Sequence, residues 1–330
     1  MTSLIARLSP LLHLTRITAA FAVTGNVWFV ILWTRSVQSE AVTVSGDSGV
    51  STASSSLVLA MLGGLFVALG FYAFAMVVND MMDYRRDRSL HPDRPIPAGR
   101  ISLEAALGLT ASTMLLAMFG AALLGSKPVL FAIVTAAAIL LFNASAKFLP
   151  SIGLVLLGLI YAAHMLIANP ELLFLWPVWL AMTHALAVGA FTHHLAGRRP
   201  TLQRRSLLLA TAGWLFWSIV LGVLSVMRND SLWPEFVPLG AAIAPACLAV
   251  LYGVFAYSKM RTTRSPAKAA DKVQRYGALW LPMYASAWAF GAGLLWPGIT
   301  LAVLSIVGLL GMTILRELYS LVEHPIGYRR

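Results

Sequence analysis

The chain has 330 residues, of which 59% are hydrophobic and only 11% charged, and its formal net charge is +11. Soluble domains carry about 25% charged residues, so this composition excludes an ordinary soluble protein and predicts an integral membrane protein. The single cysteine, Cys247, excludes a disulfide within the chain and a cysteine-based metal site.

Apolar stretches recur along the whole chain and predict its membrane-spanning helices. They cover residues 17–34, 56–78, 103–125, 128–142, 151–168, 172–192, 206–227, 236–257, 276–295 and 298–315. Because about 20 apolar residues cross a bilayer as a helix, the sequence predicts an all-α polytopic transmembrane bundle of nine to ten helices. We expect one membrane-embedded domain over residues 1–330.

The basic residues predict how the bundle is oriented. With the amino terminus in the cytoplasm and ten spans, the cytoplasmic side collects all of the 24 basic residues except Arg35, Lys127 and Arg228. The positive-inside rule therefore accounts for the charge, and we expect no nucleic-acid partner. The sequence predicts a multi-pass protein of a bacterial cytoplasmic membrane, with long charged loops at about 79–102, 193–206 and 258–275 on the cytoplasmic side.

A cluster of acidic residues lies where the second apolar run meets water. In a helix, Asp80, Asp83 and Asp87 fall at i, i+3 and i+7 and share one face. Like charges at this spacing repel, and anions near a helix C-terminus oppose the helix dipole. A divalent cation would remove both penalties, and Mg²⁺ held by carboxylates commonly bridges to substrate phosphates. The cluster predicts a Mg²⁺–diphosphate site with these three aspartates as metal ligands; a solvated helix end of mixed charge is the plainer alternative.

The cluster resembles the first signature of the UbiA superfamily of intramembrane prenyltransferases, N-D-x-x-D-x-x-x-D followed by R-P-x-x-x-G. The matching residues are Asn79, Asp80, Asp83, Asp87, Arg94, Pro95 and Gly99, and the stretch Leu14-Thr15-Arg16 is similar to the family's opening. The resemblance covers about residues 10–295, so a helix at about 298–315 is additional to the family's usual nine.

This resemblance implies a helical bundle around a central cavity that transfers an isoprenyl group from a prenyl diphosphate to a lipophilic acceptor, surrounded by membrane lipids. It implies a transferase of alkyl groups other than methyl, with Mg²⁺ as cofactor. Asp80, Asp83 and Asp87 would be catalytic as metal ligands, and Asn79 would orient them. Arg94 would neutralise the diphosphate. Elimination of diphosphate leaves a carbocation, which an apolar intramembrane cavity keeps from water.

The chain departs from the family at its second acidic motif, because the stretch Gly189–Arg199 has no carboxylate. Gly189 and His193 stand roughly where the two acidic residues would be. One hypothesis is that His193 or His194 binds a metal or hydrogen-bonds the diphosphate, although imidazole is a poor Mg²⁺ ligand. The alternative is that both histidines are interfacial residues of an eroded motif. Arg198 either contacts the diphosphate or is an ordinary basic loop residue.

Two further residues are candidates for substrate binding. Lys147, after the fourth apolar run, either contacts the diphosphate as a point charge or only extends its ammonium to the interface. His164 lies within the fifth run and either lines the acceptor pocket or makes a hydrogen bond between helices.

Other functions stay open at this point. A non-catalytic or diverged protein that binds an isoprenoid lipid would also keep the first acidic motif alone. UbiA-like phosphoribosyltransferases and terpene cyclases use a similar fold. The sequence leaves open which acceptor and which donor chain length the protein takes.

Overall fold

A computed structural model describes residues 20–38 and 56–323. Within these ranges the chain is all helical, with eleven α-helices and no strand. The α-helices are α2 (Ala20–Trp33), α5 (Leu57–Met82), α6 (Tyr84–Leu90), α7 (Leu103–Leu124), α8 (Ser126–Ala144), α9 (Pro150–Leu166), α10 (Trp176–Leu195), α11 (Arg204–Asn229), α12 (Ile243–Thr262), α13 (Pro266–Gly291) and α14 (Leu295–Glu323). Three shorter segments are the π-helical turn η2 (Thr34–Gln38) and the 3₁₀ turns η3 (Ala146–Phe148) and η4 (Leu239–Ala242).

Apart from the seven-residue α6, each α-helix coincides with one of the ten apolar runs, which confirms the all-α membrane bundle. Among the described residues, seven helical segments are long and apolar enough to cross a membrane, and α9 is apolar but shorter. Helices α10 and α13 carry more polar residues, among them the histidines that end α10. The number of spans, nine to ten, stays a prediction.

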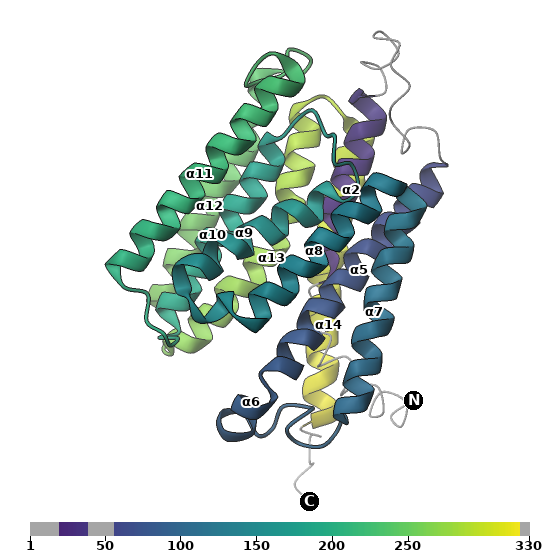
Figure 1. The fold of residues 1–330 in the computed structure, drawn as a ribbon. Coiled ribbons are helices and arrows are strands. Elements are labelled where there is room, and N and C mark those ends of the chain that lie inside the picture. Colours follow the sequence, from purple (N-terminus) through teal and green to yellow (C-terminus); the bar gives the residue numbers. More distant parts are fainter. Residues whose placement is uncertain (1–19, 39–55, 324–330) are drawn as a thin grey trace, which may run out of the picture.

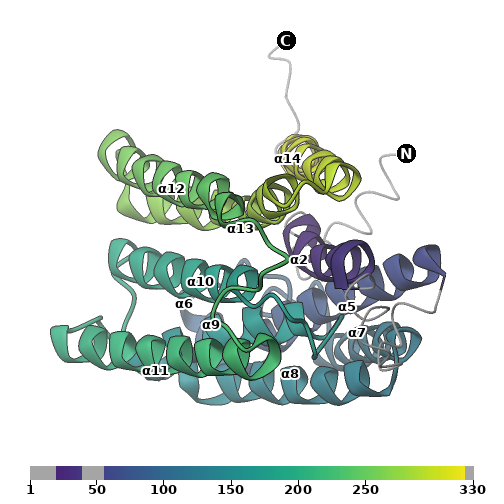
Figure 2. The same cartoon turned by 90° about the horizontal axis from the view of Figure 1, so that it is seen from above.

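The helices pack side by side, and α2 contacts α5, α9, α13 and α14 (Figure 1). Seen from above, α12 and α13 form one edge of the bundle, α8 and α11 form the opposite edge, and α10 lies between them (Figure 2). The additional helix α14 packs on α13 and α2. It is longer than the predicted 298–315. The amino-terminal stretch Leu14-Thr15-Arg16 lies outside the described residues.

The prediction of one long charged loop at 258–275 was wrong, because most of this stretch is helical. The last turn of α12 contains Lys259 and Arg261, and α13 begins at Pro266. Ser265 caps α13, since its side chain accepts a hydrogen bond from the backbone of Lys268. Proline fits the first helical position because it has no N–H to satisfy there. Because of these helix-start signals, the polar residues after Pro266 form the first turns of α13, and only a short turn separates α12 from α13.

Helices α5 and α7 approach each other at glycines. A Cβ atom added to Gly70 would lie 2.6 Å from the backbone nitrogen of Ala117, and one added to Gly120 would lie 2.6 Å from the carbonyl oxygen of Gly63. Small residues let membrane helices pack with their backbones in contact. The aspartates at the end of α5 are therefore carried by a closely packed pair of helices.

We expect Gly70→Ala to lower the free energy of unfolding by about 1–3 kcal/mol, because the new methyl group overpacks a backbone contact that cannot move independently. Gly108→Ala is the matched control on α7, since nothing lies within 4 Å of a Cβ at that position. Thermal unfolding in detergent, followed by circular dichroism, measures both variants. Equal midpoints for the two would contradict close packing of α5 on α7.

Candidate active site at the end of α5

The three aspartates lie at the junction of α5 and α6. Asp83 separates the two helices, yet its backbone N–H donates to Asn79 at 3.0 Å and that of Asp87 donates to Asp83 at 2.8 Å. The helical hydrogen-bonding pattern therefore continues through the break. Asp80 and Asp87 are buried, at 5% and 3% exposed, and Asp83 is partly buried. Carboxylates are rarely buried unless they are paired, so their partners matter.

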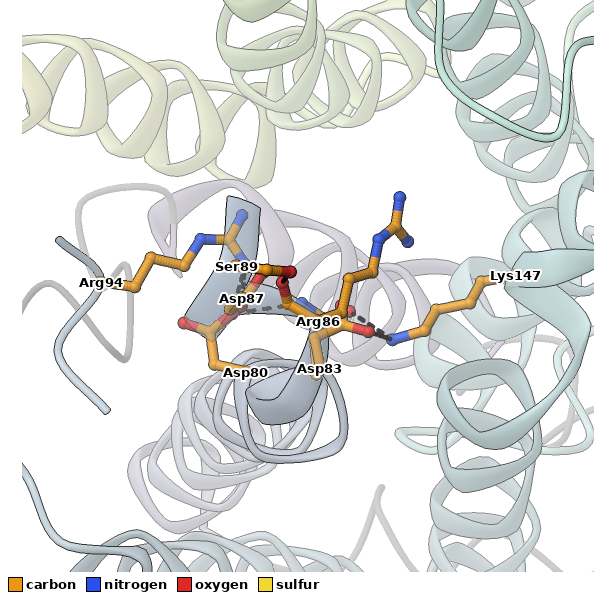
Figure 3. A network of polar contacts seen from close by, with 8 residues as sticks. Asp80, Asp83, Arg86, Asp87, Ser89, Arg94 and Lys147 are labelled. Carbon is orange, nitrogen blue, oxygen red and sulfur yellow. Dashed lines mark hydrogen bonds and ion pairs between the residues drawn. The ribbon is translucent and has the colours of Figure 1, made fainter. Parts of the chain in front are cut away.

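Arg94 is the cation on the first pair of carboxylates. Its Nη1 atom lies 2.5 Å from Oδ2 of Asp87 and 3.8 Å from Oδ1 of Asp80. One guanidinium nitrogen therefore lies near two carboxylates at once, which shows that Asp80 and Asp87 converge (Figure 3). The Arg94 side chain is 32% exposed, so solvent reaches it from one side.

Lys147 is the cation on the third carboxylate. Its Nζ atom lies 2.9 Å from Oδ1 of Asp83 (Figure 3). It also donates to Oδ1 of Asn79 at 3.2 Å. Asn79 in turn donates from Nδ2 to Oδ1 of Asp80 at 3.2 Å. Asn79 thus connects the two ion pairs, and its role in orienting the aspartates stays a prediction.

The backbone after α6 places Arg94. Ala98 N–H donates to the Arg94 carbonyl at 2.9 Å, and Gly99 follows with φ +70°, a left-handed conformation that favours glycine. Ile96 is buried with Val77 of α5, which fixes the turn on the helix. The Arg-Pro and the glycine of the sequence motif therefore have a structural role: they fold the turn that brings the guanidinium back over the aspartates.

Lys147 arrives from a different part of the chain. It lies in η3, between α8 and α9, and its side chain is 12% exposed. Its ammonium also lies 5.4 Å from the ring centre of Phe148. The structure therefore places Lys147 in the site rather than at the interface alone, 68 residues along the chain from Asn79.

The donor set can be tested against Mg²⁺. In the described part of the chain, no three His, Cys, Asp or Glu side chains form a group that would hold a metal by themselves. Mg²⁺, however, is usually bound by one or two carboxylates together with substrate phosphates and water. Asp80 and Asp87 offer two converging carboxylates held by a partly exposed guanidinium, and all donors are oxygen. The residues therefore fit a Mg²⁺ site that the diphosphate completes.

The second stretch, at the end of α10, makes different contacts. His193 Nε2 lies 2.8 Å from the carbonyl oxygen of Pro200, and Arg198 donates from Nη2 to Gln274 on α13 at 3.3 Å. Gly189 faces α9, where an added Cβ would meet Leu157 at 2.9 Å. The structure thus gives His193 and Arg198 partners in the loop and on α13, whereas it brings Asn79, Arg94 and Lys147 onto the aspartates.

His164 lies inside the bundle, away from these polar loops. It is 7% exposed and packs edge-on against Phe71 of α5, with ring centres 6.1 Å apart. Its Nε2 atom is buried and has no hydrogen-bond partner among the described residues. A buried polar atom without a partner is costly, so a ligand hydroxyl or a water molecule at this position would stabilise the protein.

The sequence reasoning missed a group of aromatic residues between α10, α12 and α13. Tyr252 and Tyr284 surround His184 and line a cavity of about 360 Å³. His184 can be recognised in the sequence as a polar residue in an apolar run. The spacing of the two tyrosines, by contrast, does not indicate that they line a cavity. Only the packing of the three helices shows that they meet.

Comparison with known proteins gives a consistent result. A sequence model of the UbiA prenyltransferase family matches residues 41–195. A structure of digeranylgeranylglyceryl phosphate synthase is similar with a TM-score of 0.55 and 19% identity, over 87% of this chain and 98% of the other. Two structures of a UbiA homologue from Archaeoglobus fulgidus are also similar.

One of these two, bound to DMAPP and Mg²⁺, has a TM-score of 0.53 and 17% identity, over 84% of this chain and 98% of the other. The second, bound to GPP and Mg²⁺, has a TM-score of 0.52 and 16% identity, over 84% and 99%. Identities this low establish the fold and not the substrate. The search of curated proteins finds no match.

Proposed function

We propose that this integral membrane protein, whose residues 41–195 match the UbiA prenyltransferase family, transfers an isoprenyl group from a prenyl diphosphate to a lipophilic acceptor with the help of Mg²⁺. The observation that carries the proposal is the convergence of Asp80, Asp83 and Asp87 with Arg94 and Lys147 at the end of α5. The Archaeoglobus fulgidus homologue binds GPP or DMAPP with Mg²⁺ on a similar fold, which supports a prenyl diphosphate as donor.

The acidic and the basic residues of the site would have different roles. Asp80, Asp83 and Asp87 would hold Mg²⁺, which supplies positive charge for the leaving diphosphate when it is bound. Arg94 and Lys147 already lie on the aspartates and would turn their N–H groups to the diphosphate oxygens. The allylic C–O bond breaks with its electron pair on the diphosphate, and the acceptor then bonds to the allylic carbon and loses a proton. The apolar bundle excludes water from this carbon.

The roles of the other candidates belong to the same proposal. His164 would line the acceptor pocket through its unpartnered Nε2 atom. Arg198 and His193 would contact the diphosphate only after leaving Gln274 and the Pro200 carbonyl. We place the site on the cytoplasmic side of a bacterial membrane, because Arg85, Arg86 and the other basic residues gather there. Residues 1–330 would form one domain, whose family-like core is about 10–295.

A second candidate function rests on one observation, the absence of a carboxylate from the stretch Gly189–Arg199. A protein with one acidic motif would bind an isoprenoid lipid or diphosphate without cleaving it. The same fold would also serve a phosphoribosyltransferase or a terpene cyclase. The binding protein and the cyclase differ from a prenyltransferase in what they make from a prenyl diphosphate, so one assay separates these three.

The test is release of diphosphate from radiolabelled geranyl diphosphate by the purified protein, with Mg²⁺ or with EDTA. We expect release that requires Mg²⁺ and is lost in Asp83→Ala, because this change removes a metal ligand and the partner of Lys147. Binding of geranyl diphosphate without release would reject the transferase and support the binding protein. Release with a cyclised product and no acceptor would support the cyclase.

A further inference from the structure

A cavity of about 360 Å³ lies between α10, α12 and α13. Small residues create it, because Ala187 of α10 and Ala249, Gly253 and Ala256 of α12 line its walls. A Cβ atom added to Gly253 would meet nothing within 4 Å, so the space beside that residue is open. Ligand sites typically have volumes of about 300–1,000 Å³, so this cavity has room for a small ring with a short apolar substituent.

The cavity is separate from the candidate active site. It lies on the face of α10 that carries His184, Val188 and Phe191. Gly189 faces away from it, toward α9. None of the lining residues is charged, so a diphosphate finds no counterion there.

Hydrogen bonds determine whether the hydroxyl of Tyr284 can donate to a ligand or only accept. His184 Nε2 lies 2.9 Å from the carbonyl oxygen of Gly277, and because a carbonyl only accepts, Nε2 must carry the proton. In the neutral ring, Nδ1 is then an acceptor, so the hydroxyl of Tyr284 donates to it at 3.2 Å. The only proton of the Tyr284 hydroxyl is used in this bond. Its oxygen therefore offers a ligand lone pairs and no donor.

The hydroxyl of Tyr252 can likewise only accept from a ligand. The hydroxyl of Tyr252 donates to the carbonyl oxygen of Val273 at 2.8 Å. Its ring lies 4.7 Å from that of His184 and 5.3 Å from that of Trp280. The cavity thus combines aromatic walls with the hydroxyl oxygens of Tyr252 and Tyr284, which can only accept from a ligand. The hydroxyls of Thr183 and Tyr257, which also line it, accept from Trp214 and Arg261 and keep their own protons.

We propose that this cavity binds a lipophilic phenol or alcohol, an apolar body with one hydroxyl that donates to the oxygen of Tyr284. Apolar and aromatic walls take the body. The proposal concerns binding at a second site, so it holds whether or not the aspartate site transfers a prenyl group.

The experiment measures binding of tritiated 4-butylphenol to the full-length protein in nanodiscs, with empty nanodiscs subtracted. The competitor 4-butylanisole has nearly the same shape but no hydroxyl proton. We expect the phenol to bind about fivefold more tightly than the ether, as for one net hydrogen bond.

Two variants locate the site. Gly253→Leu fills the cavity and should weaken binding by about tenfold or more, whereas Gly108→Leu adds the same side chain to an open position on α7 and should leave it unchanged. Tyr284→Phe should bind phenol and ether equally. Melting curves show whether each variant is folded.

Three results would overturn the proposal. They are absence of saturable phenol binding to the unmodified protein, a Gly253→Leu variant that binds as well as Gly108→Leu, and a folded Tyr284→Phe variant that still prefers the phenol.

Discussion

Replacing Asp87 by asparagine should lower the rate of Mg²⁺-dependent diphosphate release by about 1,000-fold or more, the largest effect we expect from a single substitution. Asp87 is the most buried of the three carboxylates and the closest to Arg94. The amide keeps the shape of the side chain but loses the charge that attracts a divalent cation. Asp80→Asn should have a similar effect, because both carboxylates converge on the same guanidinium.

The matched control is Asp93→Asn, an exposed aspartate next to Arg94 in sequence. It should retain nearly full activity, since changes of surface charge away from the reacting groups have small effects. Titration with Mg²⁺ gives a second measurement: Asp87→Asn should need much more metal for its residual activity. If Asp87→Asn were folded and as active as Asp93→Asn, the aspartates would not form the metal site.

Lys147→Met should reduce kcat/KM for diphosphate release by about 100-fold, because it removes a charge-assisted donor from the leaving group while keeping most of the apolar side chain. In the structure the ammonium contacts both Asp83 and Asn79, so its loss also frees Asp83. If Lys147 only extended its ammonium to the membrane interface, Lys147→Met would leave kcat/KM unchanged.

Lys127→Met is the matched control for this change. Lys127 lies at the opposite end of α8 and forms an exposed ion pair with Glu171. Such surface pairs contribute about 0–1 kcal/mol, so activity should be unaffected. Equal activity of the two methionine variants, both folded by circular dichroism, would remove Lys147 from the proposed site.

The fold could be predicted well from the sequence because membrane helices are defined by composition. Each apolar run became a helix, since a backbone in hydrocarbon must satisfy its own hydrogen bonds. The boundaries were less accurate where helices extend into water. Helix α13 begins at Pro266, well before its apolar run, and its first turns are held by local pairs such as Arg275 with Asp271, at 2.6 Å.

The candidate site could be predicted in part. The aspartates, Asn79 and Arg94 lie within one stretch of sequence, so their helical spacing and the following turn indicated that they meet. Lys147 could only be proposed, because its contact with Asp83 depends on how α8 and α9 pack against α5. The cavity beside His184 depends on the packing of three helices and could not be predicted at all.

The glycine contacts between α5 and α7 also determine which parts of the site can move. Backbones that touch at Gly70 and Gly120 leave no space for α5 to slide or tilt, so the carboxylates are anchored to a rigid pair of helices. Lys147, by contrast, belongs to the short turn η3, and Arg94 to the turn after α6. We therefore expect that, when a substrate enters, Arg94 and Lys147 move away from the aspartates by hinge motions of these two turns, while the aspartates stay in place.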